Sequence, residues 1–176
     1  MDRQHPNSDQ VRLLLVEDNP GDAELIGVLL ESVTETAYHI TCVSTLAAAE
    51  QSLGDGQADL VLLDLGLPDA SGEQVIRQVR AADVYIPIVV LTGHDSDRVQ
   101  MASIRAGADD FISKHGLTGG ELTRCITNAI ERNRVQLQLR ALLSELADAV
   151  VIVGDDRRIH FANPAAVQIF GPVSPN

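Results

Sequence analysis

LVLLDLGLP, residues 60–68, is the segment on which the assignment of the fold depends. Its first four residues are aliphatic, which is typical of a strand buried on both faces of a parallel sheet. The run ends at the carboxylate of Asp64, and Gly66 and Pro68 then favour a turn. Open α/β sheets bind ligands at the carboxyl ends of such strands, so Asp64 is a candidate functional residue. Taken alone, Asp64 is equally well explained as a residue that caps the turn.

Four further strands are expected, and helical segments alternate with all five. Apolar runs predict these strands at residues 11–16, 38–43, 86–91 and 110–113. The helices are predicted from residue 22 onward, over 45–53, over 72–82, and from 95 or 96 to 106. Ser44 is the expected N-cap of the second helix, and Gly107 is expected to end the fourth. This alternation predicts a doubly wound α/β sandwich, in which helices cover both faces of a parallel sheet.

A long helix is predicted next, over residues 121–146, where the sequence contains neither Gly nor Pro. Such a helix would be roughly 40 Å long, which is more than one face of the sheet requires. Its first part can pack on the sheet through Leu122, Ile126, Ala129 and Ile130. Four apolar residues then follow a heptad-like spacing, namely Leu139, Leu142, Leu146 and Ala149. This spacing favours a two-helix coiled-coil dimer, and a helix that folds back on its own domain is the alternative.

The C-terminal segment, residues 148–176, has a different pattern. Strands are predicted at 150–153 and 158–162 around a turn at 154–156, and a short helix at 165–170 follows Asn163 and Pro164. Two strands and one short helix cannot bury a core alone. The segment is therefore either the start of a larger domain or a piece that packs against a partner.

The composition limits the classes of function. The chain has 176 residues, 45% of them hydrophobic, and a formal net charge of -12, which argues against binding nucleic acid or an anionic membrane through a general basic surface. Cys42 and Cys125 form no CxxC pair, so two buried free thiols in a reducing compartment are expected. Residues 1–10 are polar and predict a disordered lead-in rather than an export signal. No run is long enough to span a membrane, so a cytoplasmic protein is expected.

Polar residues at the carboxyl ends of the predicted strands form a candidate site. The first strand is followed by Glu17 and Asp18, the third ends at Asp64, and the fourth and fifth are followed by Thr92 and Lys114. These strand ends meet at one edge of a parallel sheet, where three carboxylates require a cation, and oxygen ligands suit Mg²⁺. A carboxylate can attack phosphorus to form an aspartyl-phosphate, while a metal ion and an ammonium group offset the phosphoryl charge.

Four segments together resemble a two-component response-regulator receiver domain over residues 11–134. They are LLLVEDNPGDAELI (13–26), LVLLDLGLPDASG (60–72), IPIVVLTGHD (86–95) and AGADDFISK (106–114). The resemblance implies a flavodoxin-like sheet with strand order 2-1-3-4-5, followed by an extended fifth helix and linker over 121–147. It also implies that Asp64 accepts a phosphoryl group from a histidine kinase or a phosphotransfer protein, with at most intrinsic autodephosphorylation as an activity of its own.

The resemblance assigns roles to the remaining site residues. Glu17, Asp18, Asp64 and the backbone carbonyl of Gly66 would hold Mg²⁺. Thr92 and Lys114 would contact the phosphoryl group, and Phe111 matches the aromatic switch position. Gly66 and His94 occupy the two positions that tune dephosphorylation in the family. His115 stands where the family usually has Pro, so the cis peptide common there is not implied.

The segment ELADAVVIVGDDRRIHFANPAAVQIFG, residues 145–171, resembles the opening of a PAS sensory domain. Such a domain needs about 100 residues, so the segment is expected to be truncated. A receiver joined to it by a helix is similar to hybrid signalling proteins, in which the state of the receiver is passed along a coiled helix.

Two other functions remain as alternatives. A phosphorylation-independent scaffold that dimerises through the long helix would not need the acidic, Thr and Lys positions. A phosphatase with an aspartate nucleophile would need a second acid two residues after Asp64, where this chain has Gly66. The sequence shows no DNA-binding segment after residue 134, so an output as a transcription factor is not expected.

Overall fold

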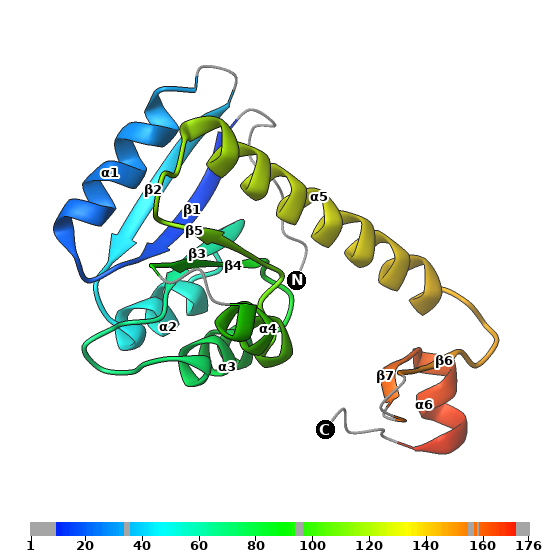
Figure 1. Ribbon diagram of the computed structural model, residues 1–176. Helices are drawn as coiled ribbons and strands as arrows, with labels where there is room; N and C mark the ends of the chain where they lie inside the picture. The colour runs from blue at the N-terminus through cyan, green and yellow to red at the C-terminus, as the bar shows by residue number, and fades with distance from the viewer. Residues whose placement is uncertain (1–9, 34–35, 94–96, 155–156, 158, 172–176) are drawn as a thin grey trace. The chain divides into compact units, whose positions relative to one another are not determined.

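The sheet has five parallel strands, as the sequence predicts. The computed structural model describes residues 10–33, 36–93, 97–154, 157 and 159–171. The strands lie in the order β2-β1-β3-β4-β5, which confirms the predicted order 2-1-3-4-5 (Figure 1). Their bounds are Gln10–Val16 for β1, Ala37–Val43 for β2, Leu60–Asp64 for β3, Ile88–Thr92 for β4 and Asp110–Ser113 for β5.

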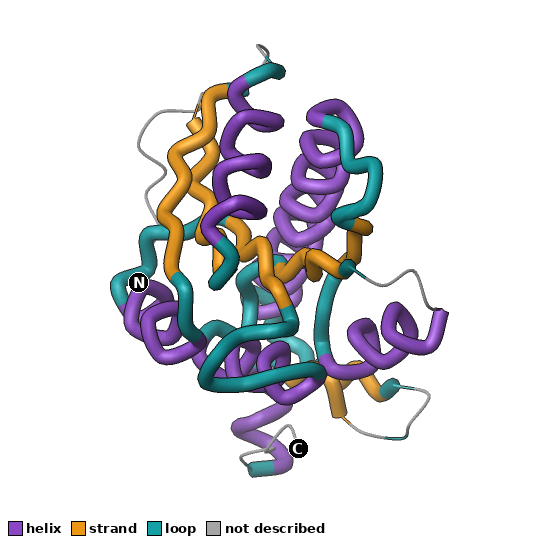
Figure 2. Tube along the Cα trace, turned by 60° about the vertical axis from the view of Figure 1, so that its left-hand side comes forward, coloured by secondary structure: helices purple, strands orange, loops and turns teal. Residues whose placement is uncertain are grey.

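Helices cover both faces of this sheet. One face packs against α1 (Pro20–Glu31) and the first part of α5 (Gly119–Ser144). The other face packs against α2 (Leu46–Gly54), α3 (Glu73–Ala82) and α4 (Asp97–Ala106). Figure 1 and Figure 2 show the strands between these two groups of helices. The predicted doubly wound sandwich is therefore confirmed.

The apolar run of β3 forms the centre of the core. Leu60 and Leu62 face the side of α1 and α5, whereas Val61 and Leu63 face the side of α2 and α3. All four have no exposed surface, and full burial of such a side chain contributes about 1.5–3 kcal/mol. Burial on both faces explains why β3 shows no alternation of polar and apolar residues, and it leaves Asp64 as the polar end of the strand.

Several local predictions need correction. The N-cap of α2 is Thr45, whose hydroxyl accepts a hydrogen bond from the Ala48 amide at 3.2 Å, and not the neighbouring Ser44. Helix α1 begins at Pro20 rather than residue 22, and β4 begins at Ile88 rather than residue 86. The predicted cap at residues 95 or 96 lies outside the described residues.

The two cysteines are free, but the prediction that both are buried is wrong. Cys42 is exposed and Cys125 is half-buried. Cys42 is exposed because β2 is an edge strand, and all of its residues are exposed or half-buried.

The chain divides into two compact units, one up to Asn133 and one from Arg134 onward. Helix α5 belongs to both. It packs on the sheet through Leu122, Ile126, Ala129 and Ile130, as predicted. Because α5 ends at Ser144, the predicted heptad positions Leu146 and Ala149 are not part of the helix.

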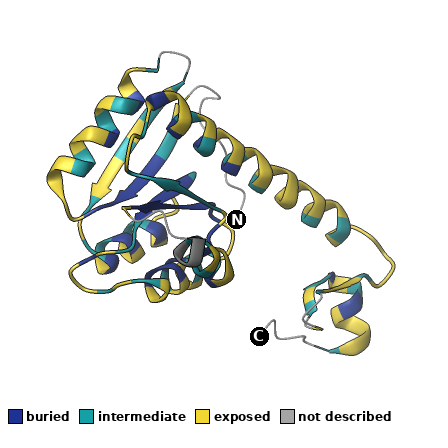
Figure 3. Ribbon diagram, viewed as in Figure 1, coloured by how far each residue is buried: buried dark blue, intermediate teal, exposed yellow. Residues whose placement is uncertain are grey.

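The second unit contains the antiparallel strands β6 (Val151–Val153) and β7 (Ile159–Ala162), followed by α6 (Pro164–Phe170). All three residues of β6 are exposed, and Ile169 and Phe170 of α6 are 67% and 70% exposed (Figure 3). The hairpin and helix are the predicted elements, and they leave much of their apolar surface uncovered.

None of the described helices is both long enough and apolar enough to span a lipid bilayer.

Candidate functional site

Strands β1 and β3 bring the acidic residues together. The two strands are neighbours, with Val16 paired to Leu63, so the residues that follow this pair are Glu17 and Asp64. Carboxylate oxygens of Glu17, Asp18 and Asp64 all lie within 4.8 Å of one another. The parallel topology is what makes this possible, because it aligns the carboxyl ends of strands that are far apart in the sequence.

Lys114 reaches this acidic cluster from the residue after β5. Its backbone amide donates to the Thr92 carbonyl at 2.8 Å. Its ammonium nitrogen Nζ lies 2.6 Å from Glu17 Oε2, 2.8 Å from Asp64 Oδ1 and 2.9 Å from Asp22 Oδ2. An ammonium group has three N–H donors. Lys114 therefore forms ion pairs with three carboxylates, and its contact with Asp22 is a hydrogen bond.

Asp22 is a member of this network that the sequence analysis does not assign to the site. It lies in the first turn of α1, where the helix dipole favours an acid. This local role explains Asp22 without any reference to Lys114. Its spacing in the motif EDNPGD was the available signal, since residues 17–22 all follow β1 directly.

The charges shift the proton affinities of these groups. Burial is the main reason that the pKa of Glu17 is raised above its ordinary value, and the nearby Asp64 adds to it, although Lys114 lowers it. For Lys114, burial is the largest effect and lowers the pKa. Hydrogen bonds to Asp64, Glu17 and Asp22 together outweigh burial, so the pKa of Lys114 is raised. The cluster thus holds Lys114 charged and leaves a surplus of carboxylates.

The donor set suits a hard divalent cation. Glu17 is 3% exposed, Asp64 is half-buried and Asp18 is exposed, so the group runs from the core to solvent. Mg²⁺ prefers carboxylate oxygens and retains several waters, and the exposed side leaves room for them. Glu17, Asp18 and Asp64 are therefore the residues that would hold the ion.

Gly66 lies in the turn that follows Asp64. Its amide donates to Asp64 Oδ2 at 2.6 Å, and a Cβ atom added at Gly66 would lie 3.1 Å from that same oxygen. Glycine therefore allows a close approach between the turn and the Asp64 carboxylate. The role of the Gly66 carbonyl as a metal ligand stays a prediction.

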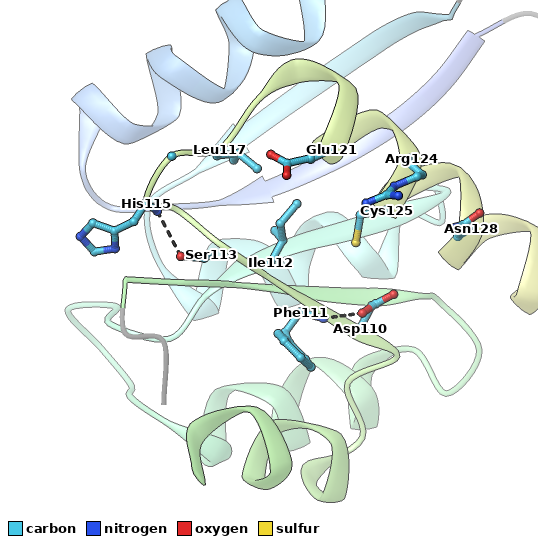
Figure 4. A pocket seen from close by; sticks show the side chains of 11 residues that line it. Asp110, Phe111, Ile112, Ser113, His115, Leu117, Glu121, Arg124, Cys125 and Asn128 are labelled. Carbon is cyan, nitrogen blue, oxygen red and sulfur yellow. Dashed lines mark hydrogen bonds between the residues drawn. The ribbon is translucent and has the colours of Figure 1, made fainter. Parts of the chain in front are cut away.

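The two predicted switch residues lie in neighbouring strands. Thr92 is the last residue of β4 and is 6% exposed, and Phe111 in β5 is half-buried against the core on the α2–α4 side. Figure 4 shows Phe111 and Ile112 on opposite sides of β5. His94 lies outside the described residues. Among the described peptide bonds none is cis, including the one before His115.

A pocket lies beside β5 and α5. It has a volume of about 350 Å³ and is lined by residues including Ile112, Leu117, Arg124 and Cys125 (Figure 4). Its lining includes neither the three clustered carboxylates nor Thr92 or Lys114. This pocket is therefore distinct from the acidic cluster.

Comparison with known proteins gives a family match in each unit. The family model of the response regulator receiver domain matches residues 13–126, and a PAS domain model matches residues 137–175. The transcriptional regulatory protein BasR of Escherichia coli is 38% identical over 104 residues, which cover 59% of this chain and 46% of BasR. The cell cycle transcriptional regulator CtrA of Caulobacter vibrioides is 35% identical over 107 residues. This chain spans about half the length of these relatives.

A solved structure supports the same assignment. The receiver domain of a sensor histidine kinase from Pseudomonas aeruginosa is 28% identical, with a TM-score of 0.60, and the match covers 69% of this chain and 98% of that domain. That domain contains a magnesium ion coordinated in its active-site cleft. Since the receiver model matches more than half of the chain and the fold agrees, the chain belongs to the response regulator receiver domain family of two-component systems.

Proposed function

We propose that the chain is a phosphoacceptor switch in which Asp64 receives a phosphoryl group from a histidine kinase or a phosphotransfer protein. The observation that carries this proposal is the convergence on Asp64 of a carboxylate cluster and the Lys114 ammonium. The Asp64 side chain is 14% exposed, so part of it is accessible to a donor. A cytoplasmic location is part of the same proposal.

The proposed reaction is a single phosphoryl transfer. An Asp64 carboxylate oxygen attacks the phosphorus of a phosphohistidine, the P–N bond breaks, and the histidine nitrogen keeps the electron pair and takes a proton. The product is an acyl phosphate on Asp64. Glu17, Asp18, Asp64 and the Gly66 carbonyl would hold Mg²⁺, which supplies positive charge beside the phosphoryl oxygens. Lys114 donates to one of these oxygens, and the Thr92 hydroxyl donates to another.

The output is proposed to pass through Thr92 and Phe111 to α5. A switch of this kind requires that the phosphorylated state favours one of two packings. Phe111 packs on one side of β5, and Ile112 packs on the other with the core beneath α5. Helix α5 then continues into the C-terminal unit. The receiver over 11–134, the helix and linker over 121–147 and the PAS-like segment over 148–176 would thus form one signalling path. Hydrolysis of its own acyl phosphate would be its only catalysis.

Labelling with a small phosphodonor tests the assignment of Asp64. The chain is incubated with acetyl phosphate, with Mg²⁺ or with a chelator, and analysed by intact-mass spectrometry. We expect one added phosphoryl group that requires Mg²⁺ and is lost in Asp64→Asn. The matched control is Asp55→Asn, at the exposed end of α2, which keeps the labelling. Labelling that survives Asp64→Asn would overturn the assignment.

A second candidate function is a dimerisation scaffold that does not need phosphorylation. The observation that favours it is an apolar stripe on α5, formed by Val135, Leu139 and Leu142, which are 60%, 52% and 64% exposed. Titration with Mg²⁺, followed by NMR, separates the two functions. A phosphoacceptor shows changes near Glu17 and Asp64, whereas a pure scaffold shows none.

A further inference from the structure

Asp22 is the Lys114 partner that does not belong to the carboxylate cluster. Lys114 Nζ lies 2.6, 2.9 and 2.8 Å from carboxylate oxygens of Glu17, Asp22 and Asp64, and it donates a hydrogen bond to Asp22. Glu17 and Asp64 are also two of the three residues whose oxygens cluster as metal ligands, and Asp22 is not. Lys114 and a divalent cation therefore compete for two of the same carboxylates, and Asp22 stands outside this competition.

We infer that Asp22 is a positioning residue. It holds the Lys114 ammonium in place when Glu17 and Asp64 bind a divalent cation. The inference rests on the proposed function and extends it to a residue on α1. When Lys114 loses part of its contact with Glu17 and Asp64, Asp22 keeps one of its donors occupied. Asp22 thereby lowers the cost of releasing the two metal ligands, and it keeps the ammonium beside Asp64.

The surroundings of Asp22 suit this role. Asn19 accepts a hydrogen bond from the Gly21 amide at 2.9 Å, and the Asn19 amide donates to Glu17 Oε1 at 3.2 Å. Local hydrogen bonds therefore stabilise the segment that runs from Glu17 to the first turn of α1, where Asp22 lies. The Asp22 side chain is 39% exposed, compared with 1% for Glu17. Pairing with Lys114 therefore costs Asp22 less desolvation than it would cost a buried carboxylate.

The test is the affinity for Mg²⁺, measured by calorimetry in the full chain. We expect Asp22→Asn to raise the Mg²⁺ dissociation constant by about fivefold, near the upper limit for a partly exposed ion pair. The matched control is Glu24→Gln, an exposed acid two residues further along α1, which removes the same charge. We expect it to change the constant by less than about twofold, because charge at a distance is screened.

A double-mutant cycle with Lys114→Gln separates positioning from simple attraction of the cation. If Asp22 acts through Lys114, Asp22→Asn has less than about a twofold effect on the dissociation constant in the Lys114→Gln background. Equal effects in both backgrounds, no effect of Asp22→Asn, or an equal effect of Glu24→Gln would overturn the inference.

A direct measurement on Lys114 guards against a Lys114→Gln variant that fails to fold. In Mg²⁺-saturated wild type, the Lys114 ammonium protons should remain protected from exchange with water in NMR spectra. In Mg²⁺-saturated Asp22→Asn they should exchange faster, and equal exchange rates would contradict the inference. If wild type binds Mg²⁺ and is labelled at Asp64 while Asp22→Asn has no effect, only this inference fails. If Asp64 is not labelled, the proposed function fails.

Discussion

Lys114 shows how the site tolerates a cation beneath the surface. Its side chain is 19% exposed, and removing a charge from water costs several kcal/mol unless hydrogen bonds and opposite charges replace the solvent. Three carboxylates provide this replacement. The same contacts link β1, α1, β3 and β5, so a change in the charge of one acid alters the interactions of the others with Lys114.

Glu17 gives a prediction about pH. Because its pKa in the folded chain is raised above the ordinary 4.5, the folded state binds the Glu17 proton more tightly than the unfolded state does. The resulting stabilisation is fully present below pH 4.5 and is lost as pH rises through the raised pKa. Glu17→Gln cannot lose a proton. We therefore expect the stability of Glu17→Gln relative to wild type to increase from pH 4.5 toward pH 7.

Chemical denaturation without divalent cations, repeated across this pH range, measures that difference. The matched control is Glu24→Gln, the same exchange at an exposed position of α1. A decrease for Glu17→Gln with rising pH would contradict the assigned direction of the pKa shift.

At the scale of elements, Arg80 fastens α3 to the sheet edge opposite the acidic cluster. Its guanidinium donates to the Ile86 carbonyl at 2.6 Å, to the Gly107 carbonyl at 2.9 Å and to Asp109 Oδ2 at 2.7 Å. Ile86 precedes β4, and Gly107 and Asp109 precede β5. The Arg80 side chain thus satisfies several hydrogen-bond acceptors at the beginning of two strands.

We expect Arg80→Lys to lower the free energy of unfolding by about 2–3 kcal/mol, because an ammonium cannot reproduce the planar set of donors. Arg77→Lys is the matched control on the same helix. Arg77 is exposed and forms a single bond with Glu73 at 2.9 Å, so its replacement should cost less than about 0.5 kcal/mol. Both variants should still be labelled at Asp64. Equal stabilities of the two variants, measured by denaturation, would show that the Arg80 contacts contribute little.

Asn163 performs a comparable task in the C-terminal unit. Its buried amide nitrogen donates to the carbonyls of Leu143, Leu146 and Asp148 at 3.2, 3.2 and 2.8 Å. Its side-chain oxygen accepts from the amides of Val150 and Ala166, both at 2.9 Å. A single residue therefore joins the last turn of α5, the segment before β6 and the start of α6.

We expect Asn163→Ala to destabilise the C-terminal unit by about 2–4 kcal/mol, since it leaves several backbone groups without partners. Hydrogen exchange should accelerate at the amides of Val150 and Ala166 but not in the receiver strands. Gln168→Ala, at an exposed position of α6, should leave these rates unchanged. Unchanged exchange in Asn163→Ala would mean that the unit is held by other contacts.

At the scale of the whole molecule, α5 connects a well-packed receiver to a unit that leaves apolar surface exposed. The stripe of Val135, Leu139 and Leu142 has the 4-3 spacing of a two-helix seam. We therefore expect the chain to dimerise through this stripe, and more strongly when beryllofluoride occupies the phosphorylation site.

Sedimentation velocity with and without beryllofluoride measures this equilibrium. Leu139→Glu should yield monomers, because it places a charge in the seam. Leu137→Glu makes the same exchange on the opposite side of the helix, where Leu137 is 38% exposed, and should leave dimerisation intact. Equal loss of dimers in both variants would contradict a seam at this stripe. Wild type that remains monomeric under all conditions would contradict the dimer itself.

Much of the architecture was accessible from local patterns. Doubly buried strands appear as uninterrupted aliphatic runs, and parallel topology brings the ends of such runs to one edge. Glu17, Asp18, Asp64 and Lys114 could therefore be grouped before any coordinates were known, and the structure places them together. The strand order followed from the resemblance to the receiver family.

Long-range side-chain contacts could not be read in this way. Asp22 and Lys114 are 92 residues apart, and nothing in the local pattern distinguishes Asp22 from an ordinary acid in the first turn of a helix. Ser44 and Thr45 can both cap a helix, and the residue at which α2 begins decides between them. The exposure of Cys42 depends on β2 being an edge strand. Periodicity reports which face of an element is buried. The partner of a polar side chain is set by the packing of whole elements, which brings Asp22 on α1 to the ammonium of Lys114.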